Sequence, residues 1–184
     1  MKSMLKSLVF VMAVFFTTPA STQELQPMLD QMAPAFTLSD LDGNKYSLEQ
    51  LRGKYIVIHF AATWCPFCNA EAPNLNQLYN DYRDKGVAVF IIDVREDIEL
   101  IKKSFARFNF SFPVLLDADG KVSANYAPEG VQPALERYEV PIASNLIIDK
   151  EGRIRFYSLL NTTSFDAKLT SLKLKLDQLI EAAK

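Results

Sequence analysis

The stretch Tyr55-Ile-Val-Ile-His-Phe-Ala-Ala-Thr-Trp-Cys-Pro-Phe-Cys68 places two cysteines directly after a long apolar run. The run, residues 55–62, is rich in β-branched side chains and too short for a helix, which is typical of a central strand covered on both faces. Pro66 is favoured at the first position of a helix, because its missing N–H would have no intrahelical partner there. The two cysteines are therefore predicted at the junction of a buried strand and a helix.

This junction gives the two thiols different chemistry. A helix N-terminus offers unpaired N–H groups and the positive end of the helix dipole, which stabilise a thiolate. The pKa of Cys65 should therefore fall below the free value of about 8.5. Cys68, within the first turn, is better shielded, so we predict that Cys65 attacks an external sulfur and Cys68 resolves the mixed disulfide. The alternative is an inert disulfide, which would stabilise little because it closes a very short loop.

The residues that follow the motif form a second recognisable unit. Apolar side chains recur at helical spacing up to a stop at Gly86, and residues 87–92 form another buried strand. The apolar helical positions are Ala72, Leu75, Leu78, Tyr79 and Tyr82. Strand, helix and strand in this order predict a βαβ unit with parallel strands.

The remaining elements predict an α/β fold with helices covering a mixed sheet. They are a hairpin within residues 35–48, a capping box and helical turn at 47–51, helices at 97–109 and 122–126, a strand at 112–116, a hairpin of strands 145–148 and 153–158, and a closing helix at 163–182. The closing helix should pack through Phe165, Leu169, Leu172, Leu176 and Leu179. Residues 127–133 are predicted to form a loop, and residues 134–138 fit no element.

Composition excludes several classes of protein. The 184 residues are 49% hydrophobic and 23% charged, which fits one globular domain and excludes disorder as the main state. A net charge of −2 without basic clusters argues against a nucleic-acid partner. Two cysteines and one histidine cannot fill a tetrahedral metal site, so no metal is predicted.

The first residues have the pattern of an export signal. Residues 1–20 combine a lysine-bearing start, an apolar run at 8–16 and small residues before a cleavage site after Ala20, as in a secretory signal peptide. A buried N-terminal helix and a retained anchor are the alternatives. We expect an extracytoplasmic, periplasmic protein with no stable membrane insertion after processing. Residues 21–32 should form a flexible lead-in and residues 33–184 the folded domain. In such an oxidising compartment the cysteines should form or exchange a disulfide.

The motif Phe60–Cys68 resembles that of the thioredoxin superfamily, and within it the secreted thiol-disulfide oxidoreductases of the TlpA/ResA type, in the AhpC/TSA redoxin group. The resemblance runs from Ala33 to the C-terminus. Its other matches are Ala33–Phe36 with Asp42-Gly43, Phe112–Asp117 and Ile147–Ile154. It implies a thioredoxin-like fold with an N-terminal hairpin and an inserted α-β element. It also implies exchange with protein cysteines as a reductant, a membrane-bound electron donor, no dissociable cofactor, and a monomer.

The resemblance also implies supporting residues around the cysteines. Glu71 matches a glutamate that lies near the cysteines in this type and assists proton transfer; the alternative is a solvated acid in the first helical turn. His59 takes the strand position where many thioredoxins carry a buried acid, and could exchange the proton of Cys68 near neutral pH. Its alternative is a strand histidine bonded to the backbone. Trp64 and Pro66 complete the motif, and Pro66 with Phe67 tunes the redox potential.

The substrate groove departs from the family pattern. A cis-proline should lie six residues before Asp149, but that position is Ala143, and Pro141 lies two residues earlier. Either the strand is longer and Pro141 is the cis-proline, or Ala143 takes its place; the count favours Ala143. In the second case the groove is looser while the thiol chemistry is unaffected.

Two other functions remain as alternatives. Peroxiredoxins carry Pro-x-x-x-Thr/Ser-x-x-Cys, and Ile58 and Ala62 occupy the two defining positions here, which argues against a thiol peroxidase. A dithiol chaperone for metal or haem would need further ligands, and His59 is predicted on a buried strand. Covalent haem attachment is excluded because Asn69, not histidine, follows Cys68.

Overall fold

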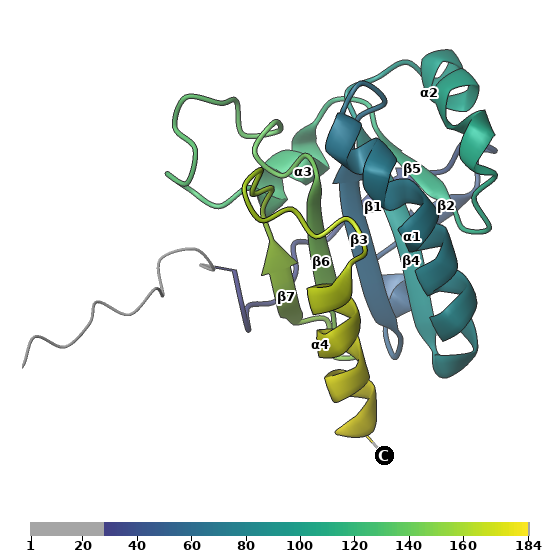
Figure 1. The fold of residues 1–184 in the computed structure, drawn as a ribbon, viewed down its shortest axis with the longest axis vertical. Helices are drawn as coiled ribbons and strands as arrows, with labels where there is room; N and C mark the ends of the chain where they lie inside the picture. Colours follow the sequence, from purple (N-terminus) through teal and green to yellow (C-terminus); the bar gives the residue numbers. More distant parts are fainter. Residues whose placement is uncertain (1–27, 184) are drawn as a thin grey trace, which may run out of the picture.

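A computed structural model describes residues 28–183 (Figure 1). The expected signal peptide, residues 1–20, lies outside the described residues. A five-stranded sheet with the order β5-β4-β3-β6-β7 forms the centre of the fold. Its strands are β3 (Tyr55–Ala61), β4 (Val87–Val94), β5 (Val114–Asp117), β6 (Ser144–Ile148) and β7 (Ile154–Ser158). β4 runs parallel to β3 and β6 antiparallel to it, which confirms the predicted mixed sheet.

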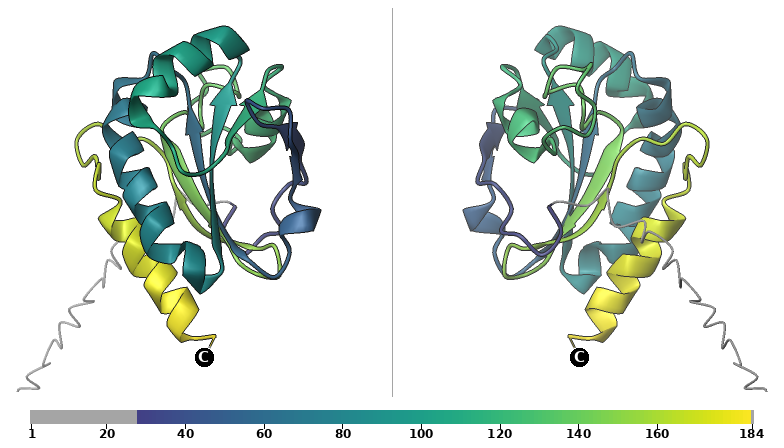
Figure 2. Two further views of the ribbon diagram at one scale, coloured as in Figure 1. Left: turned by 90° about the vertical axis from the view of Figure 1, so that its right-hand side faces the viewer. Right: turned by 90° about the vertical axis from the view of Figure 1, so that its left-hand side faces the viewer.

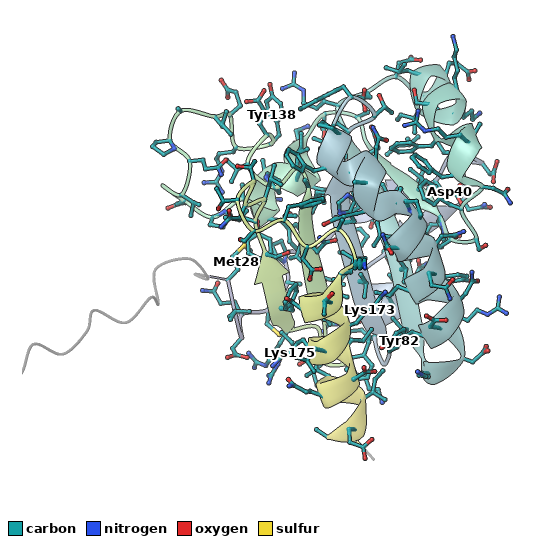
Figure 3. The ribbon with its side chains drawn as sticks, viewed as in Figure 1. Met28, Asp40, Tyr82, Tyr138, Lys173 and Lys175 are labelled. Carbon is teal, nitrogen blue, oxygen red and sulfur yellow. The ribbon has the colours of Figure 1, made fainter. Side chains whose placement is uncertain are left out.

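Helices and the N-terminal hairpin cover the two faces of the sheet. Helices α1 (Pro66–Tyr82) and α4 (Thr170–Glu181) lie on one face, and the hairpin of β1 (Thr37–Ser39) and β2 (Lys45–Ser47) lies on the other with α3 (Lys121–Tyr126), as Figure 2 shows. Helix α2 (Ile98–Phe105) adds Ile101 and Phe105 to the core beneath α1. Tyr82 lies at the end of α1 and is labelled in Figure 3. Its hydroxyl donates a hydrogen bond to Asp177 of α4, 2.8 Å away, which ties the two helices together.

The central strand β3 explains the apolar run in the sequence. All seven of its residues are buried, and successive side chains point to opposite faces. Val57 and Ala61 join the core beneath α1 and α4, whereas Ile56, Ile58 and Phe60 join the core beneath the hairpin and α3. A strand between two cores has no solvent-facing side and needs no alternation of polar and apolar residues.

The N-terminal hairpin confirms the local predictions. The carboxylate of Asp40 accepts hydrogen bonds from the backbone N–H groups of Asp42 and Asn44, both at 2.9 Å, and closes the turn. Ser47 and Gln50 form the reciprocal bonds of a capping box ahead of the 3-10 turn Glu49–Leu51. These contacts close the turn of the hairpin and join β2 to the 3-10 turn that follows it.

The closing helix is shorter than predicted. It begins at Thr170 instead of residue 163, because polar side chains organise turns before it. The side-chain oxygen of Asn161 accepts from the N–H groups of residues 163 and 164, and Leu169 adopts a left-handed conformation with φ 57°. Phe165 was therefore wrongly placed on the helix; it packs edge-on against Phe67, with ring centroids 4.9 Å apart.

Two other boundaries differ from the prediction. The helix expected at 97–109 consists of α2 and a following 3-10 turn, Ala106–Phe108. Residues 127–143 form only bends and turns, which confirms the loop predicted at 127–133. Residues 28–32, the described end of the expected flexible lead-in 21–32, are bonded to the sheet: the Asp30 N–H donates to the Ile154 carbonyl at 2.8 Å. Within residues 28–183, no helix combines the length and apolar character needed to cross a membrane.

Candidate active site

Cys65 lies between the end of β3 and the start of α1. It is the N-cap residue of α1, Pro66 takes the first helical position, and the Cys65 sulfur accepts a hydrogen bond from the Cys68 N–H at 3.3 Å. Both cysteines are free thiols and largely buried. The predicted strand–cysteine–helix junction is confirmed, and N–H groups of the first helical turn point to the Cys65 sulfur.

The surroundings move the pKa values of the two thiols in opposite directions. The hydrogen bond from the Cys68 side chain, together with the N–H groups of Cys68 and Phe67 and the charge of His59, lowers the pKa of Cys65 to about 6 against the opposing effect of burial. Burial raises the pKa of Cys68 far above its usual range, and the Cys65 sulfur and Glu71 carboxylate add to the effect. Cys65 is therefore a thiolate at neutral pH, whereas Cys68 keeps its proton.

A buried polar network lies beneath the cysteines. It joins His59 of β3, Glu71 of α1 and Asn145 of β6. His59 Nδ1 lies 3.1 Å from a Glu71 carboxylate oxygen and 3.0 Å from Asn145 Oδ1. The Asn145 amide donates to Glu71 at 3.1 and 3.3 Å. Both partners of Nδ1 are oxygens, so this nitrogen carries the hydrogen.

This network removes one alternative for each of two residues, and their roles in proton transfer stay predictions. Glu71 is buried against His59, which excludes a solvated acid, and the described partners of His59 are side chains, not backbone groups. Within residues 28–183, His59 Nε2 has no hydrogen-bond partner. Asn145 was missed from the sequence, although a polar amide within an apolar strand was a usable signal. Unpaired buried groups are costly and often mark functional sites.

A second polar contact fixes the loop before Cys65. The carboxylate of Glu96, just after β4, accepts from both the N–H and the hydroxyl of Thr63, the latter at 2.6 Å. Asn69 donates to the Thr63 carbonyl at 3.1 Å. Because β4 runs parallel to β3, its carboxyl end lies at the same sheet edge as the cysteines. That register is the signal by which Glu96 could have been found.

Asp93 lies next to this loop at the end of β4. Its side chain is buried, and neither carboxylate oxygen finds a hydrogen-bond partner meeting normal geometry among the described residues. Burial, followed by the negative charge of Glu96, raises the pKa of Asp93 to about 8. Asp93 is therefore largely protonated at neutral pH.

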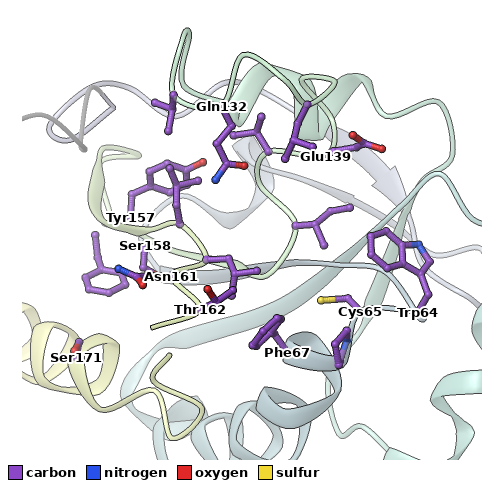
Figure 4. A pocket seen from close by; sticks show the side chains of 18 residues that line it. Trp64, Cys65, Phe67, Gln132, Glu139, Tyr157, Ser158, Asn161, Thr162 and Ser171 are labelled. Atoms are coloured by element: carbon purple, nitrogen blue, oxygen red, sulfur yellow. The ribbon is translucent and has the colours of Figure 1, made fainter. Parts of the chain in front are cut away.

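A pocket of about 950 Å³ opens beside Cys65 (Figure 4). Its walls are residues 64–67 of the cysteine motif, parts of the segment 131–142, and residues 156–162 after and within β7. The Cys65 sulfur points into it, and Trp64 stands on its rim with 66% of its surface exposed. The low-pKa thiol therefore lies in the wall of an open pocket, with 3% of the Cys65 surface exposed.

The two predicted groove residues have different positions. No cis peptide bond occurs within residues 28–183, so Pro141 is trans, and it does not line the pocket, whereas Val140 and Ile142 do. Ala143 has a left-handed φ of 61° and donates its N–H to the Phe60 carbonyl at 2.8 Å. It lines a second cavity of about 190 Å³ together with Glu71. The hypothesis that Pro141 is the cis-proline was wrong.

The arrangement of strand, cysteine pair and helix is matched by known proteins. The AhpC/TSA family profile matches residues 29–157, well over half of the chain. The chain belongs to the AhpC/TSA family. Within this family it is a thioredoxin-superfamily redoxin of the ResA/TlpA type, as the motif predicted.

Individual members of this group cover most of the chain. The thiol-disulfide oxidoreductase ResA of Bacillus thuringiensis subsp. konkukian is 32% identical over 72% of this chain and 70% of its own. ResA of Geobacillus kaustophilus is 31% identical over 80% of both chains. A secreted Mycobacterium tuberculosis disulfide oxidoreductase, homologous to E. coli DsbE, has a TM-score of 0.62 at 27% identity and covers 78% of this chain and 96% of its own. These similarities confirm the predicted thioredoxin-like fold.

Proposed function

We propose that this thiol-disulfide oxidoreductase reduces disulfides in partner proteins outside the cytoplasm, with Cys65 as nucleophile and Cys68 as resolving thiol. The observation that carries the proposal is the contrast between the two thiols: Cys65 has a pKa of about 6 beside an open pocket, and Cys68 has a raised pKa beneath it. An inert disulfide would need neither the pocket nor the contrast.

The reaction begins when the Cys65 thiolate attacks one sulfur of a partner disulfide. A bond forms between Cys65 and that sulfur, the partner's S–S bond breaks, and its second sulfur leaves as a thiolate that takes up a proton. Cys68 then loses its proton and attacks the Cys65 sulfur, which releases the partner's first thiol. Two electrons have passed to the partner, and the Cys65–Cys68 disulfide awaits an external dithiol, which we propose to be membrane-bound.

The buried network supplies a place for the Cys68 proton. We assign Glu71 and His59 the role of accepting it, since Glu71 acts electrostatically on Cys68 and bonds His59. Glu71→Gln and His59→Ala should slow the second step more than the first and change its pH profile. Alkylation of Cys65 at an unchanged rate is the control for Glu71→Gln; in His59→Ala the alkylation curve should move to higher pH, because the charge of His59 lowers the pKa of Cys65. An unchanged pH profile in both variants would remove the network from the mechanism.

The direction of transfer is tested by the redox potential of the Cys65–Cys68 pair. We expect a value near that of thioredoxin, about −270 mV, whereas a value near that of DsbA, about −120 mV, would indicate an oxidant. When reduced Cys68→Ser is mixed with a partner protein that carries a disulfide, the mixed disulfide between Cys65 and the partner should accumulate. Cys65→Ser should accumulate none. Rapid consumption of peroxide with no disulfide reduction would favour the peroxidase alternative.

The proposed site of action depends on the first 20 residues. The secreted Mycobacterium tuberculosis relative supports export, as does the signal-like pattern of residues 1–20. Expression of the full chain in a bacterium, followed by fractionation and N-terminal sequencing, should give a periplasmic protein that begins at Ser21. An unprocessed cytoplasmic product would contradict this part of the proposal.

A further inference from the structure

The pocket wall formed by residues 128–140 is fastened to the body of the protein. The Arg137 guanidinium donates to the carbonyls of Ala124 and Ala127, both at 3.0 Å, at the end of α3. Arg95 stacks over the ring of Tyr138 at 4.1 Å from its centroid. These contacts fix a segment without helix or strand, so the pocket is largely formed before any partner arrives.

The lining of the pocket around Cys65, taken over all its walls, is mainly apolar. The apolar lining residues are Trp64, Pro66, Phe67, Val131, Leu135, Val140, Ile142, Phe156, Tyr157, Leu159 and Leu160. Trp64 and Leu135 are among the few large apolar side chains of the described chain that stay exposed, at 66% and 46%. A volume of about 950 Å³ accommodates several side chains. Exposed apolar groups around a nucleophile form a binding surface for apolar side chains.

The charge on this pocket has one sign. Among the described residues, Glu139 is the only Asp, Glu, Lys or Arg that lines it, and Glu136 lies on the same fastened segment. Among residues 28–183 neither carboxylate forms an ion pair, because the neighbouring Arg137 is turned toward backbone carbonyls and Glu129. An acidic partner segment would be repelled here, and a basic one attracted. Oxidised glutathione, which carries several carboxylates, is poorly suited to this pocket for the same reason.

We propose that the pocket selects cysteine-bearing polypeptide segments in which bulky apolar residues flank the cysteine and a basic residue lies nearby. The apolar side chains pack between Trp64 and Leu135 while the basic side chain approaches Glu139. This inference rests on the proposed function, since it names the substrate class of the same thiol. A polypeptide is the occupant because a single small disulfide would leave most of the apolar wall uncovered.

The test compares peptides of one length whose single cysteine forms a mixed disulfide with the same coloured aromatic thiol. One peptide flanks the cysteine with leucine and lysine, a second replaces leucine by serine, and a third replaces lysine by glutamate. The reduced protein releases the coloured thiol, and the second-order rate is measured for each. We expect the first peptide to react about tenfold faster than the second, since a buried leucine side chain favours binding substantially, and several-fold faster than the third.

Two variants and a matched control test which pocket residues cause the preference for leucine and for lysine in the peptide. Leu135→Ser should remove most of the leucine preference, and Glu139→Gln should remove the preference for lysine over glutamate. Leu100→Ser should change neither, because Leu100 has the same 46% exposure but lies on α2, outside the pocket. A small neutral aromatic disulfide measures the intrinsic reactivity of Cys65 in every variant.

The outcomes distinguish failure of the proposed substrate class from failure of the proposed disulfide reduction itself. Equal rates for all three peptides, with normal reaction of the small disulfide, would overturn the substrate class and leave the thiol chemistry standing. Equal loss of rate with every substrate in Leu135→Ser would also overturn the inference, since it indicates a disturbed cysteine loop. If the wild-type protein reduces neither peptides nor the small disulfide, the proposed function itself fails.

Discussion

Replacement of Cys68 by alanine tests what holds the neighbouring thiolate. The hydrogen bond from the Cys68 side chain is the largest cause of the low Cys65 pKa, about 6, so its removal should raise that pKa toward the free value of about 8.5. Cys68→Ser keeps an O–H donor and should stay closer to the wild type. The comparison separates loss of the donor from loss of the sulfur.

The loss of Cys65 reaction rate expected in Cys68→Ala depends on pH. If the full shift were lost, the thiolate fraction near neutral pH would fall from about nine-tenths to about 3%. A thiolate of higher pKa is intrinsically more nucleophilic, by about tenfold for this difference, so the net loss of rate is only about threefold at about pH 7. At about pH 5 the thiolate fractions differ by about 300-fold, and the net loss rises to about thirtyfold. These values are upper limits, because the backbone donors remain.

The assay is the rate of alkylation by iodoacetamide between about pH 4 and about pH 9, in reduced wild type and in both variants. The wild-type curve should have its midpoint near pH 6, with the alanine variant shifted upward and the serine variant between them. Coincident curves for wild type and Cys68→Ala would show that the partner thiol does not stabilise the thiolate. A wild-type midpoint near 8.5 would refute the assignment of Cys65 as nucleophile.

Three further changes test the surrounding structure. Asp93 is ionised in the unfolded chain above about pH 4 but stays protonated in the folded protein up to a pKa of about 8, so stability should fall as pH rises through this window. Asp93→Asn should flatten that fall, which urea unfolding across the window measures; an unchanged slope contradicts the raised pKa. Glu96→Ala should lower the free energy of unfolding by about 1–3 kcal/mol by leaving a backbone N–H unpaired, and Glu96→Gln by less. Gly152→Ala should cost about 1 kcal/mol or more, because φ is 87° and the new methyl group meets Arg52, whereas Gly43→Ala, with open space, should cost less.

The sequence predicted those features that depend on local chemistry. Three of these features depend only on residues close together in the sequence, and all three are confirmed. They are the buried strand before Cys65, the proline at the first helical position and the Ser47–Gln50 capping box. The predicted start of the closing helix failed because helical spacing of apolar residues continued into a region where Asn161 organises turns instead. Periodicity reports which side chains are apolar, but a competing side-chain hydrogen bond decides where the helix begins.

The parts of the site that could not be predicted depend on contacts between distant residues. Asn145 reaches Glu71 across 74 positions, and Glu96 reaches Thr63 across 33. Strand order and register must be known before such pairs can be named. The burial of Glu71, which the sequence left open, is likewise set by the strands packed beneath α1.

The chain's own backbone partly covers the outer edges of β5 and β7, and this affects how readily copies of the protein aggregate. An open strand edge can recruit another chain and start aggregation. Here Asp40 bridges to Leu115 on the β5 side, and the stretch 30–32 is bonded along part of β7 on the other. Both borders of the sheet are thus partly occupied by the chain's own backbone. Crowded molecules should accordingly resist edge-to-edge stacking, and deletion of residues 28–32 should produce β-rich aggregates on storage.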